Sequence, residues 1–253
     1  MEKTLGKRNL RDFGRLSNKD GLHLKEGLFF RSGKLYRLSK KEKESIEKLG
    51  IKTIIDLRTA DERDQKPDDV IEGVTYHVVP LIDSAMFGIT HEAGKRAKYS
   101  EPPNMPELYK KLVLLETPQQ GLKKAFSILL DPNRVGPILL HCTEGKDRAG
   151  ILSALFLYAL GYDEETILED YELSNARSEK KGKAYRNLIR IFMFNWKLAH
   201  NVYLAMLAKR EYLLSAFSAI KENYGTIDAY LRDVLDVTKE KLDEFKARVM
   251  IKE

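Results

Sequence analysis

Cysteine is almost absent from this sequence, with Cys142 the single one among 253 residues. One cysteine excludes an intramolecular disulfide, a multi-cysteine zinc site and a C-x-x-C redox pair. Long apolar runs are also missing: the longest, at 149–162, is too short to span a bilayer, and residues 1–12 contain no apolar core of signal-peptide length. We therefore expect a cytoplasmic protein, with signal-less export left open.

The excess of one sign of charge is small. The formal net charge is +6, which favours anionic partners such as phosphates. Lys and Arg are interleaved with Glu and Asp almost everywhere and form no basic stripe, so we expect no nucleic-acid partner. No metal-ligand constellation is visible, and we expect neither a metal nor another cofactor. The composition, 43% hydrophobic and 32% charged, is that of a soluble, core-forming protein.

The first part of the chain alternates predicted strands with helices. Short β-branched or aromatic runs occur at 28–31, 52–57, 74–80 and 137–141, and a helical pattern covers 39–49. This alternation predicts an α/β fold with a central, mostly parallel sheet. The C-terminal half reads as helical, over 149–160, 163–173, 183–217, 226–235 and 239–250. Capping chemistry predicts helix starts at Ser39, Thr117, Asp163 and Thr238.

The most informative stretch is ILLHCTEGKDRAG at 138–150, an apolar strand followed by a short polar loop and an apolar helix. The backbone N–H groups of 143–148 can point into one concavity at the positive end of that helix, a geometry that binds phosphate. Cys142 stands at its base, where a thiolate would be stabilised as a nucleophile. The planar guanidinium of Arg148 can bind two phosphate oxygens at once. The alternative is a buried structural cysteine at a strand end.

The C-x-x-x-x-x-R spacing, with His141 before it and Gly145 inside it, resembles the signature of cysteine-dependent protein phosphatases. The full loop is similar to that of atypical bacterial tyrosine phosphatases, which have dual specificity and also hydrolyse phosphoinositides. Other blocks are similar in the same order, namely NLRDFG at 9–14, FRSG at 30–33, GI at 50–51, IDLR at 55–58 followed by Glu62, and YGT at 224–226. The resemblance implies a protein tyrosine phosphatase-like fold, with one phosphatase domain over 1–253 and a helical lid-like insertion at 183–218.

The resemblance also implies roles for the loop residues. Cys142 would be the nucleophile, Arg148 the phosphate clamp, and Asp147 the acid that protonates the leaving oxygen and then activates water. In conventional tyrosine phosphatases this aspartate lies on a separate loop, and Asp83 occupies a plausible place for it. We favour Asp147, and geometry decides between them.

The remaining loop residues would bind the substrate. They are Thr143, Glu144, Gly145 and Lys146. Lys146 would add a second positive charge for an inositol headgroup, or it is an ordinary surface lysine. His141 would support the thiolate from behind, or it is a satisfied histidine at a strand end. We expect the charged residues of the neighbouring blocks to brace the loop rather than touch substrate: Arg11, Asp12, Asp56 and Arg58.

One position departs from the family pattern. Ala149 stands where a Ser or Thr usually follows the Arg, and that hydroxyl eases departure of the cysteine thiolate. We therefore expect slow breakdown of the phosphoenzyme.

The sequence thus favours a phosphatase acting on phosphotyrosine, with phosphoserine, phosphothreonine and phosphoinositides as further candidates. The partners would be phosphoproteins or phosphoinositides, and the apolar and basic residues of 183–217 suggest a lid or a peripheral membrane contact. A catalytically silent phosphate-binding module and a rhodanese-like sulfurtransferase are the alternatives. The oligomeric state is not determined by the sequence.

Overall fold

A five-stranded sheet forms the centre of the protein in a computed structural model, which describes residues 8–18, 20–82 and 102–252. The strands lie in the order β1 (Arg11–Asp12), β3 (Phe29–Ser32), β6 (Ile138–His141), β4 (Thr53–Asp56) and β5 (Thr75–Val78). Only β1 is antiparallel to its neighbour. Every residue of β3, β4 and β6 is buried, as expected for parallel strands covered on both faces. The prediction of an α/β fold with a mostly parallel sheet is confirmed.

A second, two-stranded sheet pairs the C-terminal strand with a short strand in the first part of the chain. In it β2 (Leu22–Leu24) is antiparallel to β7 (Met250–Lys252). Neither strand was predicted, because segments this short carry no recognisable period.

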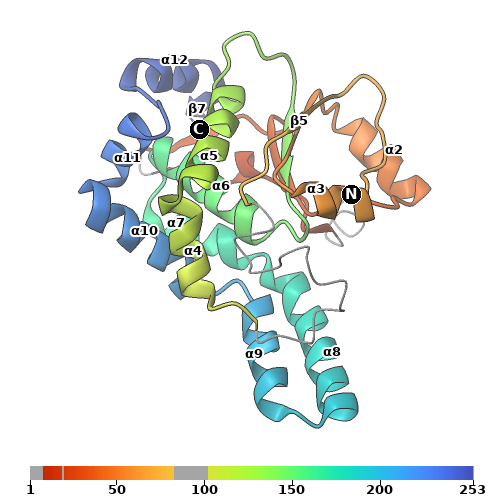
Figure 1. Cartoon of the computed structure of the whole chain (residues 1–253). Helices are drawn as coiled ribbons and strands as arrows, with labels where there is room; N and C mark the ends of the chain where they lie inside the picture. Colours follow the sequence, from red (N-terminus) through yellow and green to blue (C-terminus); the bar gives the residue numbers. More distant parts are fainter. Residues whose placement is uncertain (1–7, 19, 83–101, 253) are drawn as a thin grey trace.

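Helices cover both faces of the central sheet (Figure 1). The helical elements of the described residues are the 3-10 helix η2 (Phe13–Arg15) and helices α2 (Lys40–Lys48), α3 (Ala60–Gln65), α4 (Met105–Leu114), α5 (Glu116–Leu129), α6 (Asp147–Ala159), α7 (Glu164–Glu172), α8 (Asn175–Met193), α9 (Trp196–Met206), α10 (Arg210–Tyr224), α11 (Ile227–Asp233) and α12 (Lys239–Val249). Helix α6 follows the loop that begins at Cys142. Beyond Arg148 it has apolar residues on all sides, because almost every one of its residues is buried.

Most of the helix starts that the sequence predicted are capped by a side chain. Ser39 and Glu42 form a reciprocal capping box at α2, and Asp163 and Thr238 cap α7 and α12. The expected start at Thr117 is wrong, since α5 begins at Glu116 with no side-chain cap.

The boundaries of the C-terminal helices differ from those of the helical insertion expected at 183–218. Helices α8 and α9 form an antiparallel hairpin that begins earlier, at Asn175, and projects from the body of the protein (Figure 1). Helix α10 instead packs into the main core through Leu213, Phe217 and Ile220. The hairpin is therefore limited to Asn175–Met206. Among the described residues, no helix combines the length and apolar character needed to cross a bilayer.

Candidate active site

The loop between β6 and α6 presents unpaired backbone donors. The strand ends at His141 and the helix begins at Asp147 with no side-chain cap. No N–H group of residues 143–146 has an acceptor within the described part of the chain. Four free donors beside a helix N-terminus form an anion-binding site.

The loop is held in this orientation from behind by Arg31 and Asn9. The Nε of Arg31 donates to the Gly145 carbonyl at 2.9 Å and its Nη2 to the Lys146 carbonyl at 3.1 Å. The Asn9 amide also donates to the Gly145 carbonyl, at 2.8 Å. Because N–H and C=O point in opposite directions across a peptide plane, fixing these carbonyls turns the next two N–H groups to the other side.

Asp170 holds Arg31 in place. Its carboxylate accepts from Arg31 at 3.0 Å and from Arg11 at 2.7 Å, and all three side chains are largely buried. Burial, and next the charge of Arg11, lower the pKa of Arg31 to about 10. Burial on its own raises the pKa of Asp170, but the two arginines outweigh it, so that pKa lies below its ordinary value. Asp170 therefore stays ionised as the counter-ion of Arg11 and Arg31.

Gly145 is required by the close approach of the loop to β3. Its φ is +67°, in the left-handed region, and a Cβ there would lie 2.5 Å from the Ser32 carbonyl oxygen. Any other residue would push the loop away from the strand that carries Arg31.

The guanidinium of Arg148 is paired with Glu62 of α3. Its Nη1 and Nη2 donate to the two carboxylate oxygens at 2.5 and 2.7 Å, and the Thr143 hydroxyl donates to the same carboxylate. Burial alone raises the pKa of Glu62, but these hydrogen bonds lower it to about 2. Burial likewise lowers the pKa of Arg148, whereas Glu62 and the negative charges of Cys142 and Asp147 raise it above its ordinary value. Arg148 is thus a fixed cation beside Cys142.

Asp147 is the first residue of α6 and is oriented by two donors. Its Oδ1 accepts from the Tyr109 hydroxyl at 2.7 Å and lies 2.8 Å from the Lys146 ammonium. The Tyr109 and Tyr171 hydroxyls are 2.5 Å apart. Burial, and next the charge of Asp147, raise the pKa of both tyrosines well above the ordinary value, so they remain neutral donors. Oδ2 of Asp147 has no protein partner within the described residues.

Lys146 points to the hairpin rather than to open solvent. Its ammonium donates to the carbonyls of Ala205 and Leu207, both at 3.0 Å, at the C-terminal end of α9. Together with Asp147, these partners account for all three of its N–H donors. Lys146 therefore joins the loop to the base of the hairpin.

Glu144 lies at the centre of a basic cluster. Its carboxylate lies 2.6 Å from Lys181, 3.7 Å from Lys34 and 3.8 Å from Arg177. Burial, and next the other cations, hold the pKa of Lys34 below its ordinary value against the opposing effect of Glu144. One carboxylate facing three cations leaves this side of the loop positively charged.

His141 is fully buried behind the loop. Its Nδ1 lies 3.4 Å from the Cys142 carbonyl oxygen, and its Nε2 lies 3.2 Å from Asp68. Asp56, Asp68 and His141 are close enough together to share a metal ion. The guanidinium of Arg58 already donates to both aspartates, at 2.7 and 2.5 Å, and a cation in that position opposes metal binding. We interpret the cluster as a charged brace.

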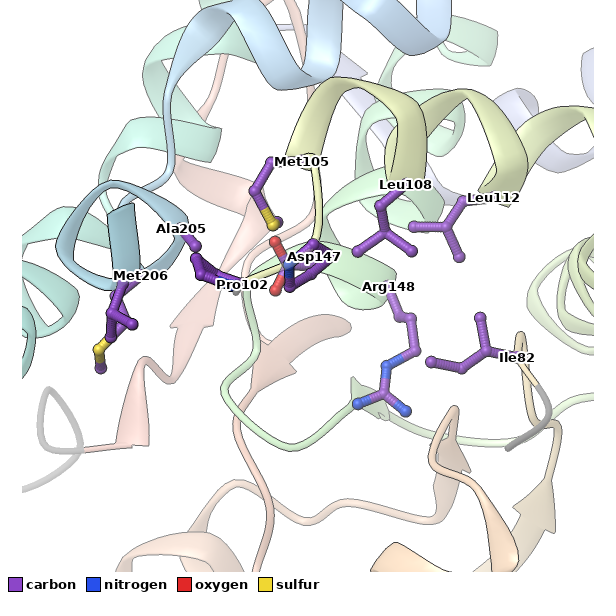
Figure 2. Close-up of a pocket in the computed structure, with 11 residues that line it drawn as sticks. Ile82, Pro102, Met105, Leu108, Leu112, Asp147, Arg148, Ala205 and Met206 are labelled. Atoms are coloured by element: carbon purple, nitrogen blue, oxygen red, sulfur yellow. The ribbon is translucent and has the colours of Figure 1, made fainter. Parts of the chain in front are cut away.

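Asp147 and Arg148 line a cavity of about 300 Å³. Figure 2 shows these two side chains among the others that surround the cavity. Its other walls are apolar and come from α4 (Met105, Leu108), the end of α9 (Ala205, Met206) and neighbouring segments. Cys142 is 2% exposed and does not line it. Within the described residues, no side chain forms a hydrogen bond with the Cys142 sulfur, and Ala149 is fully buried.

The sequence-predicted site residues therefore lie in one loop, but their side chains point in different directions. Arg148 and Asp147 face the cavity. Lys146 pairs with Asp147 but donates its other two hydrogen bonds to the end of α9, and Glu144 pairs with Lys34, Arg177 and Lys181. Of the residues expected to brace the loop, Arg11 pairs with Asp170, Asp56 pairs with Arg58, and Asp12 caps η2. Asp83 lies outside the described residues.

Sequence reasoning assigned no role to six residues that contact the loop or its supports: Asn9, Arg31, Glu62, Tyr109, Asp170 and Tyr171. Asn9, Arg31 and Glu62 lie in or beside the family-like blocks, and Arg31 is also a charged residue inside a mostly apolar strand. Tyr109, Asp170 and Tyr171 carried no signal in the sequence.

Comparison with known proteins gives one consistent result. A model of the tyrosine phosphatase family matches residues 3–251. A protein of Cupriavidus necator named as a tyrosine-protein phosphatase is 30% identical over 233 residues, covering 90% of this chain and 82% of the relative. The triple specificity protein phosphatase PtpB of Mycobacterium tuberculosis is 29% identical over 242 residues, covering 83% and 86%. The catalytic core of the Saccharomyces cerevisiae PP-IP phosphatase SIW14 is 17% identical, with a TM-score of 0.35 over 77% of this chain and 88% of that one.

Proposed function

This chain belongs to the tyrosine phosphatase family, and from that premise we propose that it hydrolyses phosphotyrosine through a phosphocysteine intermediate. It is a phosphomonoesterase of the protein tyrosine phosphatase type. The observation that carries the proposed mechanism is that the N–H groups of residues 143–146 have no acceptor among the residues that the structure describes. The comparisons give no support to a silent binding module or a sulfurtransferase.

In the first step the loop N–H groups and Arg148 hold the phosphate oxygens. The Cys142 thiolate attacks phosphorus, so that an S–P bond forms as the bond from phosphorus to the ester oxygen breaks. Asp147 gives its proton to the departing oxygen from Oδ2, the atom that has no protein partner within the described residues. The charge that develops on the equatorial oxygens is stabilised by the same fixed donors.

In the second step Asp147, now a carboxylate, accepts a proton from water. The water oxygen attacks phosphorus, the S–P bond breaks, and inorganic phosphate and the Cys142 thiolate are released. Tyr109 keeps the carboxylate oriented through both steps, since it donates to Oδ1 only.

The proposal extends to phosphoserine, phosphothreonine and phosphoinositides. The basic cluster of Lys34, Arg177 and Lys181 around Glu144 supports substrates that carry a further anionic group near the scissile phosphate. The name of the triple specificity relative supports a range wider than one class of phosphoester.

The proposal treats the whole chain as one phosphatase domain. A catalytic thiol without a cysteine partner suits a reducing compartment, which supports a cytoplasmic location.

The test is phosphate release from a phosphotyrosine peptide and from a panel of phosphoinositides, with wild type compared with Cys142→Ser. We expect activity in the presence of a chelator, inhibition by vanadate as a mimic of the trigonal phosphate, and loss in the variant. The ratio between the two substrate classes separates protein from lipid. Activity that survives in Cys142→Ser, or that a chelator abolishes, would contradict the mechanism. Thiosulfate turnover without phosphate release would indicate a sulfurtransferase.

A further inference from the structure

The α8–α9 hairpin has an exposed apolar tip. Of the fifteen large hydrophobic side chains that are exposed among the described residues, seven lie between Tyr185 and Trp196. The most prominent are Phe192, Phe194 and Trp196, which are 75%, 83% and 63% exposed. An exposed apolar patch of this kind marks an interaction surface rather than a fold requirement.

The stability of the hairpin does not explain these side chains. Ile189, Leu198 and Ala199 form a small core between the two helices, separate from the main core. Phe194 ends α8 with a φ of +49°, a left-handed conformation in which Gly or Asn is usual. A large aromatic residue at that position is unfavourable for folding, so another role must favour it.

The hairpin also carries the charge excess of the protein. Residues 175–206 contain seven Lys or Arg and one acidic residue, a net charge of +6, which equals the formal net charge of the whole chain. The rest of the sequence is therefore balanced, and the hairpin is the exception to the interleaving of charges. Near the tip, the Arg190 guanidinium lies 3.7 Å from the centre of the Trp196 ring.

We propose that the tip of this hairpin, residues 188–197, docks on a membrane surface that contains anionic lipids. Aromatic residues flanked by Lys and Arg are typical of segments that lie in the membrane interface. A second copy of the chain would bring two strongly positive hairpins together and is disfavoured.

Docking would place the catalytic cavity near the lipid headgroups. The end of α9, at Ala205 and Met206, lines the cavity together with Asp147 and Arg148. At 1.5 Å per residue, α9 spans about 15 Å from Trp196 to that wall, and interfacial segments insert by about 5–10 Å. A phosphate on a lipid headgroup would then lie within reach of the cavity. This consequence rests on the proposed function, whereas the docking itself does not.

Trp196 is the single tryptophan of the chain, so its fluorescence reports on the tip alone. The test is titration of the full chain with phosphatidylcholine vesicles containing 30% phosphatidylserine, with pure phosphatidylcholine vesicles in parallel. We expect a blue shift and co-sedimentation with the anionic vesicles only, weakened by high salt. Phe192→Ser with Phe194→Ser should weaken binding at least tenfold, and Lys197→Gln about fivefold. Matched changes of exposed residues outside the hairpin, Val70→Ser with Val135→Ser and Lys239→Gln, should leave it unchanged.

Several results would overturn the proposal. They are an unshifted spectrum, equal binding to neutral vesicles, equal loss in the hairpin and control variants, or a dimer that the Phe192 and Phe194 changes dissociate. Hydrolysis of a soluble phosphotyrosine peptide, measured on the same samples, should be the same in all variants. If that hydrolysis is absent in wild type while the vesicles bind, the proposed function fails and the docking stands.

Discussion

The Glu62 carboxylate binds both terminal nitrogens of Arg148, at 2.5 and 2.7 Å. The pair uses the edge of the guanidinium formed by Nη1 and Nη2, and Nε has no partner within the described residues. In the proposed mechanism Nε donates to a phosphate oxygen. Glu62 also caps α3 through the Thr59 N–H. The orientation of Arg148 is therefore set by the start of a helix that is remote in sequence from the loop at 142–148.

The first prediction concerns this orientation. Glu62→Gln keeps the shape of the side chain but removes the charge that fixes Arg148, so kcat/KM for a phosphotyrosine peptide should fall about tenfold to a hundredfold. Steady-state kinetics at neutral pH check this, with Glu47→Gln on the exposed face of α2 as the control. Unchanged kcat/KM would show that Arg148 is oriented without Glu62.

The second prediction concerns acid stability. The folded protein lowers the pKa of Glu62 from 4.5 to about 2, so the carboxylate contributes stability above pH 4.5 and loses it as the pH falls toward 2. The difference in unfolding free energy between wild type and Glu62→Gln should therefore shrink steadily below pH 4.5. Urea unfolding at pH 6, 4 and 3 measures it. A difference that stays constant with pH would mean that the charge of Glu62 is not what stabilises the fold.

The third prediction separates the two candidate acids. Asp147→Asn should lower kcat by about a hundredfold or more on phosphotyrosine peptides, because the leaving oxygen receives no proton. The loss should be smaller for an aryl phosphate with a very acidic leaving group. Tyr109→Phe, which removes only the donor to Oδ1, should have a weaker effect. Asp83→Asn, tested in parallel, should be nearly silent, and the reverse pattern would assign the acid to Asp83.

The fourth prediction follows from Ala149. With no hydroxyl to assist departure of the thiolate, hydrolysis of the phosphoenzyme should limit turnover. A pre-steady-state trace should show a burst of the leaving alcohol close to one equivalent. Ala149→Ser adds one oxygen at this buried position and should raise kcat several-fold while reducing the burst. A linear wild-type trace would rule out slow phosphoenzyme hydrolysis.

The fifth prediction tests the brace behind the loop. Asp170→Asn leaves Arg11 and Arg31 buried without their counter-ion, so the unfolding free energy should fall by about 3–5 kcal/mol. Asp233→Asn, which breaks an exposed pair with Arg232, should leave stability almost unchanged. Urea denaturation compares the two. Equal stability in both variants would mean that the brace contributes nothing to the fold.

The sequence by itself determined the sheet, the helical C-terminal half and the position of the catalytic loop. These follow from local causes: the apolar runs of β3, β4 and β6, the capping side chains of α2, α7 and α12, and the fixed spacing between Cys142 and Arg148. Each of these signals lies within a few residues of the element that it specifies.

Only the tertiary structure decided what surrounds that loop. Glu62 and Tyr109 lie 86 and 38 residues from Arg148 and Asp147, which they contact directly, and Asp170 lies 25 residues from Gly145, which it supports through Arg31. Packing of the helices against the sheet brings these residues close to the loop. The sequence pattern of a single chain carries no signal for pairs so far apart. The same reason explains why Lys146, which the sequence assigned to substrate, is found holding the end of α9. A side chain's neighbours, and therefore its role, depend on which distant segments the fold brings within hydrogen-bonding distance.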